Sequence, residues 1–310
     1  MPCRHPNLRW PGGSAYRRIW DVGDLTDDRR PPISGETRLA AVIGAPVRHS
    51  LSPTLLNAAF AEAGLDWHFT ALEVAEGRAS EALDAARALG LVGLSVTMPH
   101  KAAVSAAVDE RTEQAEVLDA VNCVVVEGDR LVGHNTDGDG FLDGLRHATG
   151  FDPSGRSTVV LGAGGAARAV VLALARAGAA EVAVVNRTAS RAEVAAGLAG
   201  PVGRMVGPNE VSEAVAAADL VVNATSVGMA DDGALPVDPA SVANGALAVD
   251  LIYHPPETAW VAALRGRGIE AHNGLSMLVF QAAHAFRLWT GSEAPVAVMD
   301  AAARAVRATR

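Results

Sequence analysis

Cysteine is scarce in this sequence, and its scarcity excludes two kinds of scaffold. Only Cys3 and Cys123 occur among the 310 residues, and neither a CxxC nor an HExxH spacing is present. A disulfide framework needs several pairs of cysteines, and a structural zinc site needs a closely spaced set of Cys and His ligands. We therefore expect no disulfide scaffold and no metal site.

Long apolar runs and an excess of positive charge are also missing. The chain has no apolar run long enough for a membrane helix, and the opening "MPCRHPNLRW" leads into no signal-peptide core. Its formal charge of −9 argues against a nucleic-acid surface. With 49% apolar and 20% charged residues, the composition is that of an ordinary globular protein. We expect a cytoplasmic protein with neither a membrane nor a nucleic acid as partner.

The length of the chain suggests two domains that follow an N-terminal extension. A chain of 310 residues exceeds the usual size of a single core. Residues 1–37 hold several Pro, Gly and Arg residues without a hydrophobic period, which predicts a flexible extension. From Arg38 onward, short β-branched runs alternate with alanine-rich stretches, the pattern of βα units and a parallel sheet. One helix is expected to have Ser52 as its N-cap and Pro53 as its first helical residue.

A second unit follows the linker "TGFDPSGR" of residues 149–156, whose Gly, Pro and Ser mark a break. There "STVVLGAGGAARAVV" carries the spacing Gly162-x-Gly164-x-x-Ala167 between a predicted strand and a predicted helix. This spacing is typical of a dinucleotide-binding turn. The first glycine permits the tight turn, the second lets the backbone approach a pyrophosphate, and the helix start supplies free N–H groups. Together with the short strands downstream, it predicts six parallel strands in an α/β dinucleotide-binding unit.

The end of the next predicted strand indicates which dinucleotide binds. An NAD-binding unit usually carries an Asp or Glu there for the ribose hydroxyls, but this sequence has "NRTASR". A carboxylate would repel a 2′-phosphate, whereas Asn186, Arg187, Thr188 and Arg191 offer two cations and neutral hydrogen-bonding groups. The residues therefore predict NADP. The alternative is a solvated helix start whose arginines bind nothing.

Nine stretches in order along the chain resemble the shikimate dehydrogenase family: "IGAPVRHSLSP", "VTMPHK", "AVNCVV", "GHNTDGDGF", "GAGGAAR", "NRTASR", "NATSVGM", "DLIYHPPET" and "GLSMLVFQAAHAF". The resemblance covers nearly the whole chain from Arg38. It implies an open α/β substrate-binding domain over residues 38–137, completed by residues 275–310. It also implies a Rossmann NADP-binding domain over residues 138–274, with the active site in the cleft between the two domains.

The family resemblance also implies an activity and roles for individual residues. The implied reaction is the reversible, NADP-dependent reduction of 3-dehydroshikimate to shikimate in aromatic amino-acid (chorismate) biosynthesis. The enzyme would then be an oxidoreductase acting on a CH–OH group. The resemblance also allows a homodimer. Lys101 and Asp137 resemble the catalytic pair. Substrate contacts are implied for Ser50, Ser52, Thr97, Asn122, Tyr253 and Gln281. Contacts to NADP are implied for Gly162, Ala163, Gly164, Gly165, Ala166, Asn186, Arg187, Thr188, Arg191, Thr225, Ser226, Leu251, Gly274 and Met277.

The lone lysine of "VTMPHK" suits this chemistry. Hydride transfer to a ketone leaves negative charge on the oxygen, so a proton donor placed there lowers the barrier. Lys101 would be that donor, and Asp137 would orient its ammonium group. On residue type alone, Gln281 would be a core glutamine, and Ser52 is equally well explained as a helix cap.

One position departs from the family pattern. Many members have Asn where this chain has Ser95, and a serine hydroxyl has a shorter reach than an asparagine amide. Quinate and an amino-substituted shikimate therefore stay open as substrates beside shikimate.

Two other classes of protein explain less of the sequence. A Rossmann-type regulatory protein would account for "GAGGAA" and "NRTASR" but has no use for Lys101, Asp137 and Asn122 together. A glutamyl-tRNA reductase-like enzyme would need a nucleophilic cysteine and a tRNA-binding surface. Cys3 lies in the predicted extension and the net charge is acidic, so this second class also fits poorly.

Overall fold

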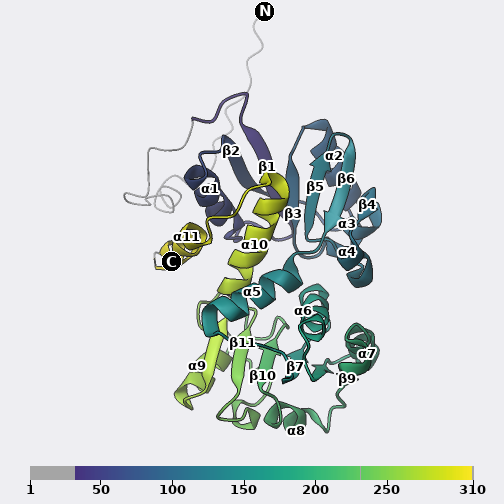
Figure 1. Ribbon diagram of the computed structural model, residues 1–310, viewed down its shortest axis with the longest axis vertical. Coiled ribbons are helices and arrows are strands. Elements are labelled where there is room, and N and C mark those ends of the chain that lie inside the picture. The colour runs from purple at the N-terminus through teal and green to yellow at the C-terminus, as the bar shows by residue number, and fades with distance from the viewer. Residues whose placement is uncertain (1–31, 231, 309–310) are drawn as a thin grey trace, which may run out of the picture.

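The computed structural model describes residues 32–230 and 232–308, which form two α/β units stacked end to end (Figure 1). Each unit contains a six-stranded sheet. Two helices, α5 (Asp137–Thr149) and α10 (Leu275–Thr290), lie where the units meet. The predicted N-terminal extension falls mainly on residues 1–31, which lie outside the described residues. No helix in the described ranges is both long and apolar enough to cross a bilayer.

The first sheet is mixed, and its strand order is β2-β1-β3-β5-β6-β4. The strands are β1 (Arg38–Gly44), β2 (Trp67–Glu73), β3 (Gly93–Val96), β4 (Glu110–Arg111), β5 (Cys123–Glu127) and β6 (Arg130–His134). β5 runs antiparallel to both neighbours, so this strand departs from the parallel sheet expected from the βα pattern. The reason is local: only Gly128 and Asp129 join β5 to β6, and so short a turn can connect only antiparallel strands.

Helices cover both faces of the first sheet and enclose separate parts of its core. On one face lie α1 (Ser52–Glu62), α10 and α11 (Val296–Ala308), and on the other lie α2 (Ala79–Ala88), α3 (Lys101–Ala107) and α4 (Glu113–Leu118). The predicted N-cap role of Ser52 is wrong, because the cap position is Leu51 and no side chain caps the helix. Instead, the hydroxyl of Ser50 accepts a hydrogen bond from the Ser52 backbone N–H at 3.2 Å.

The second sheet is parallel throughout, with the strand order β12-β11-β10-β7-β8-β9. Its strands are β7 (Ser157–Leu161), β8 (Glu181–Val185), β9 (Gly203–Met205), β10 (Leu220–Asn223), β11 (Leu247–Asp250) and β12 (Glu270–Asn273). Helices α5, α6 (Gly165–Arg176) and α7 (Ala189–Gly197) pack on one face, and α8 (Val211–Ala216) and α9 (Ala259–Gly266) on the other. This is the order of a doubly wound dinucleotide-binding fold, which confirms the six predicted parallel strands.

The backbones of α5 and α10 lie in direct contact where the two units meet. A Cβ atom on Gly140 would lie 2.6 Å from the backbone nitrogen of Gln281, and one on Gly144 would lie 2.8 Å from the carbonyl carbon of Ser276. Real Cβ atoms do not approach backbone so closely, so both glycines are needed for this packing. After crossing α5, helix α10 contributes Phe286 and its neighbours to the core of the first unit.

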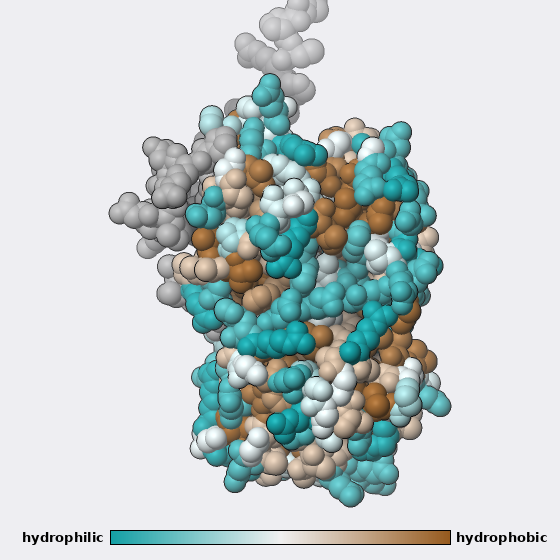
Figure 2. All heavy atoms as spheres, in the orientation of Figure 1, coloured by the Kyte–Doolittle hydropathy of each residue, from teal (hydrophilic) through white to brown (hydrophobic). Residues whose placement is uncertain are grey.

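Figure 2 shows the polarity of one face of this assembly. Hydrophilic residues gather in a band across its middle, at the level where α5 crosses between the units. A hydrophobic area lies above this band, over β5 and β6.

Candidate active site

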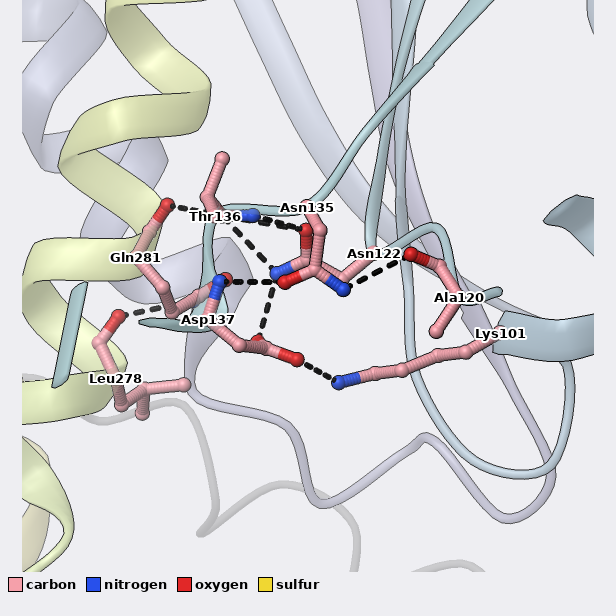
Figure 3. Close-up of polar contacts among 8 residues, drawn as sticks. All are labelled: Lys101, Ala120, Asn122, Asn135, Thr136, Asp137, Leu278 and Gln281. Atoms are coloured by element: carbon pink, nitrogen blue, oxygen red, sulfur yellow. Dashed lines mark hydrogen bonds and ion pairs between the residues drawn. The ribbon is translucent and has the colours of Figure 1, made fainter. Parts of the chain in front are cut away.

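A lysine and a carboxylate from different elements form a short ion pair at the junction of the two units. Lys101 is the first residue of α3 and Asp137 is the first residue of α5. Lys101 Nζ lies 2.5 Å from Asp137 Oδ2. Figure 3 draws this contact as a dashed line. The lysine side chain is 18% exposed and the aspartate side chain 6% exposed. Lys101 therefore reaches the surface of the site, whereas Asp137 holds it from beneath.

Asn122 fixes the second oxygen of this carboxylate. It lies directly before β5, and its side-chain amide donates to Asp137 Oδ1 at 2.7 Å and to Thr136 Oγ1 at 3.0 Å. The side-chain oxygen Oδ1 of Asn122 accepts from the backbone N–H of Thr136 at 2.7 Å. Counted over whole residues, Asn122, Thr136 and Asp137 are each at most 5% exposed. Because both carboxylate oxygens have a partner, Asp137 can present its charge to Lys101 in only one direction.

Three positioning residues in and around this network were missed in the sequence. Asn135 donates to the Ala120 carbonyl at 2.9 Å and accepts from the Asp137 N–H at 3.1 Å. Thr136 donates to the Gln281 carbonyl at 3.1 Å. His100, directly before Lys101 in the sequence, is 1% exposed, and its Nε2 lies 2.8 Å from the Val74 carbonyl oxygen. A signal was present for the first two, because "HNTDG" places consecutive small polar residues between a strand and a helix.

The start of α6 faces Lys101 from the second unit. A Cβ atom on Gly165 would lie 3.6 Å from Lys101 Cδ. Gly162 has a φ of 114°, and a Cβ there would lie 2.8 Å from the Ala224 carbonyl oxygen, so only glycine suits this turn. A Cβ on Gly164 would meet nothing within 4 Å. The open surface at this helix start fits a dinucleotide pyrophosphate, with Ala163 and Ala166 in the same turn and first helical residues.

The predicted 2′-phosphate residues lie at the end of β8 and the start of α7. Thr188 is the residue before α7 and its side chain does not cap the helix. The Asn186 amide donates to the Thr188 carbonyl at 3.0 Å, which shapes this turn. Arg187 and Arg191 are exposed. The four residues are gathered at the carboxyl edge of the sheet, next to the glycine turn, where a dinucleotide is bound in this fold.

A buried carboxylate joins the two loops that follow β10 and β11. Asp250 accepts from the Asn223 amide at 3.0 Å and from the Thr258 hydroxyl at 2.7 Å. Burial raises the pKa of Asp250 above its usual range, against the lowering effect of these hydrogen bonds. The first loop carries Thr225 and Ser226, and the Thr225 hydroxyl donates to the side-chain oxygen Oδ1 of Asn223 at 2.7 Å.

The second loop and the start of α10 lie close together. A Cβ on Gly274 would come within 2.0 Å of the Leu251 carbonyl oxygen, so the backbones touch. Met277 packs at the edge of the second unit's core, whereas Tyr253 packs against the core of the first unit. Burial raises the pKa of the Tyr253 phenol. The loop after β11 therefore spans the junction.

The remaining predicted substrate residues lie at three places. Gln281 is in α10 beside Thr136, but its side-chain amide donates to the Leu278 carbonyl at 2.9 Å, within its own helix (Figure 3). Ser50 and Ser52 lie at the start of α1, and Thr97 directly follows β3. The structure thus brings Lys101, Asp137, Asn122 and the backbone of Gln281 into one network, whereas the Gln281 amide is turned into its own helix.

Comparisons with known proteins agree with this arrangement. Residues 42–124 match a family model described as the shikimate dehydrogenase substrate-binding domain. Residues 147–230 match one described as shikimate/quinate 5-dehydrogenase, and residues 274–304 match the shikimate 5′-dehydrogenase C-terminal domain. A Moorella thermoacetica protein named shikimate dehydrogenase (NADP(+)) is 47% identical over 277 residues, which cover 86% of this chain and 93% of that protein.

Solved structures are similar over the same range. Shikimate 5-dehydrogenase from Thermus thermophilus, in complex with NADP(H) and shikimate, aligns with a TM-score of 0.80 at 38% identity, covering 87% of this chain and 99% of that one. Quinate dehydrogenase from Corynebacterium glutamicum, in complex with NAD, aligns with a TM-score of 0.79 at 32% identity, covering 86% and 98%. The two-unit fold is therefore common to enzymes named for different polyols and solved with different cofactors.

Proposed function

This chain belongs to the shikimate dehydrogenase family, and we propose that it catalyses the reversible, NADP-dependent reduction of 3-dehydroshikimate to shikimate. This reaction is a step of aromatic amino-acid (chorismate) biosynthesis. Lys101 and Asp137 would be the catalytic pair. The observation that carries the catalytic assignment is the ion pair of Lys101 with a carboxylate whose other oxygen is held by Asn122. Relatives that are 44% and 47% identical bear the same NADP-dependent name, so NADP is the cofactor of this family member.

In the proposed reaction, Lys101 handles the proton. When bound, NADPH supplies the hydride that adds to the carbonyl carbon. The carbonyl oxygen gains negative charge, and the ammonium group of Lys101 donates a proton to it, which leaves a hydroxyl and a neutral amine. Asp137 holds the ammonium group in place and stabilises its charge before the transfer. In the oxidative direction the neutral amine accepts the hydroxyl proton.

The composition of the chain supports a chemical role for Lys101. It is the only lysine in the sequence, since every other position in the Lys+Arg count of 26 is an arginine. An arginine could pair with Asp137 equally well, but a guanidinium group does not release its proton in a protein. A site that needed only a positive charge would be served by arginine, whereas a cation that also donates its proton can be lysine but not arginine.

Two substitutions at position 101 test this role. Lys101→Arg keeps the positive charge and Lys101→Met removes it, and both should lower kcat by roughly 10² to 10⁴ while KM for shikimate changes much less. NADP reduction is followed by absorbance, and substrate binding is measured separately by calorimetry. If Lys101→Arg retains turnover within about threefold of wild type, Lys101 acts only as a charge and the assignment is wrong.

The single lysine also permits a direct chemical test. Reductive methylation with ¹³C-formaldehyde labels the Lys101 amine and the chain N-terminus. The Lys101 methyl signal, identified by its loss in Lys101→Arg, should respond to added shikimate because the substrate oxygen lies against this amine in the proposed site. A Lys101 signal unmoved by saturating shikimate would contradict contact between the two.

The substrate preference is the second part of the proposal. The names of the relatives support shikimate as the substrate. Quinate and amino-substituted shikimate remain the alternatives, because Ser95 stands where many family members have Asn. Ser95 lies on β3 and is only 7% exposed. A panel of shikimate, quinate and aminoshikimate, compared by kcat/KM, decides among them. Replacing Ser95 by Asn should raise the preference for shikimate. A quinate kcat/KM above that for shikimate would overturn the first choice.

The proposed contacts of the other predicted residues follow their places in the fold. Ser50, Ser52, Thr97, Asn122 and Tyr253 would hold the carboxylate and hydroxyl groups of the substrate. Gln281 would join them only after its amide leaves the Leu278 carbonyl. Residues 38–137 with 275–310 would be the substrate domain and residues 138–274 the NADP domain. A cytoplasmic location and a homodimer stay predictions, to be checked by fractionation and by light scattering.

A further inference from the structure

We infer that Arg168 is a third phosphate-binding arginine, which holds the pyrophosphate of bound NADP in addition to the predicted 2′-phosphate contacts of Arg187 and Arg191. The inference extends the proposed function, on which it rests. Arg168 lies in α6, one turn after the glycine loop, and its backbone N–H bonds to the Gly164 carbonyl at 2.9 Å.

Arg168 stands out because nearly all described arginines have partners. Among arginines whose side chains the structure describes, the others contact a carboxylate, a carbonyl oxygen or an aromatic ring. The exceptions are Arg168, Arg187 and Arg191. All three lie near the carboxyl edge of the second sheet, in or directly before the first two turns of α6 and α7. Unpartnered cations are thus concentrated on the side where a dinucleotide binds in this fold.

Burial distinguishes Arg168 from the other two. Arg187 and Arg191 are exposed to solvent, but the Nε atom of Arg168 is buried and has no hydrogen-bond partner. Among the residues that the structure describes, one other buried side-chain nitrogen or oxygen atom lacks a hydrogen-bond partner, the Nε1 atom of Trp260. A buried donor without an acceptor is unfavourable, and a bound ligand that supplies the missing acceptor would remove this cost.

The geometry of α6 directs this side chain towards the glycine loop. Side chains of an α-helix lean towards its N-terminus, so an arginine one turn into α6 extends back to the level of Gly164 and Gly165. Ala167 is buried against the sheet, and Leu198, directly after α7, packs against a cluster that contains Leu172. Arg168 therefore lies on the flank of α6 that faces α7, between the open helix start and the 186–191 turn. A pyrophosphate at the helix start offers acceptor oxygens at this place.

The test separates the phosphates of the cofactor by direct binding. Calorimetry measures the affinity of Arg168→Met for NADPH, NADH and adenosine 2′-monophosphate, which has the 2′-phosphate but no pyrophosphate. NADPH and NADH should each bind roughly 10- to 100-fold more weakly, because a charge-assisted hydrogen bond is lost. The affinity for adenosine 2′-monophosphate should not change. The thermal midpoint of the free protein should stay the same or rise, since methionine removes the unsatisfied donor.

A matched control and a second variant complete the design. Arg176→Met changes an exposed arginine at the far end of α6 that pairs with Glu113, and it should leave all three affinities unchanged. If Arg168→Met does not fold, Arg168→Gln is measured instead and should show the same pattern. Arg168→Lys should recover part of the lost NADPH affinity.

Each of the remaining outcomes would contradict one specific claim. Unchanged NADPH affinity in Arg168→Met, with a wild-type protein that binds NADPH and oxidises shikimate, overturns the role of Arg168 and leaves the proposed function intact. Weaker binding of adenosine 2′-monophosphate moves the contact to the 2′-phosphate and overturns the pyrophosphate assignment. A wild-type protein that binds neither NADPH nor NADH overturns the proposed function itself.

Discussion

Alanine substitutions at Gly162 and Gly164 should separate two different needs for glycine in the turn after β7. At Gly162, φ is 114° and a new Cβ would lie 2.8 Å from the Ala224 carbonyl oxygen. At Gly164, φ is an ordinary −79° and a new Cβ would meet nothing within 4 Å. Gly162→Ala should therefore destabilise the fold, whereas Gly164→Ala should impair only cofactor binding.

The sizes of the two effects follow from these contacts. For Gly162→Ala, an unfavourable backbone conformation costs roughly 1–3 kcal/mol and overpacking against backbone roughly another 1–3 kcal/mol. At about 2–4 °C per kcal/mol, the thermal midpoint should fall by roughly 5–20 °C. For Gly164→Ala, a weaker helix cap and a less flexible unfolded chain oppose each other, so the change in stability should stay below about 1 kcal/mol.

The effect of Gly164→Ala on binding should be larger than its effect on stability. A methyl group at this position would keep the pyrophosphate away from the N–H groups at the start of α6. Loss of one charge-assisted hydrogen bond corresponds to roughly 10- to 100-fold in affinity.

Thermal denaturation with and without NADP, together with NADPH fluorescence titration, measures both quantities in the same samples. A Gly164→Ala protein that binds NADPH as tightly as wild type would refute the placement of the pyrophosphate at this helix start. A Gly162→Ala protein with an unchanged midpoint would refute the argument from its backbone.

Two further predictions concern the cofactor choice and the helix pair between the units. Changing Asn186 to Asp together with Arg187 to Ala should lower kcat/KM with NADP by roughly 10-fold or more while the value with NAD holds or rises; a parallel fall with both cofactors would indicate a damaged fold instead. Gly144→Ala should destabilise the protein by about 1–3 kcal/mol, because its Cβ would lie 2.8 Å from the Ser276 carbonyl carbon. Gly266→Ala in α9, where a Cβ meets open space, is the control and should leave the thermal midpoint unchanged or higher.

Features that depend on a few neighbouring residues were readable from the sequence. The turn after β7 needs glycine at one position for its backbone and at another for access, so the spacing of Gly162 and Gly164 predicted the turn and the helix that follows. The strand periodicity predicted the second sheet, because all six strands follow the same βα pattern.

Features that depend on contacts between distant segments were missed or only partly predicted. The antiparallel direction of β5 follows from its hairpin with β6, which the βα pattern of the neighbouring segments concealed. Asn135 and Thr136 join the hydrogen-bond network of the site only because β6 ends beside Asn122. Ser52 is a good cap by residue type, but the path of the chain before α1 places Leu51 at the cap position.

The sequence by itself determined the two α/β units, the dinucleotide turn and the family, because each of these is encoded in short segments whose spacing has a direct physical meaning. The tertiary structure decided which groups meet. Lys101 and Asp137 are 36 positions apart, and only the folded chain brings Nζ to 2.5 Å from the carboxylate. The partnerless Nε of Arg168 could not be read from the chain either, because a missing partner is a property of the surrounding space.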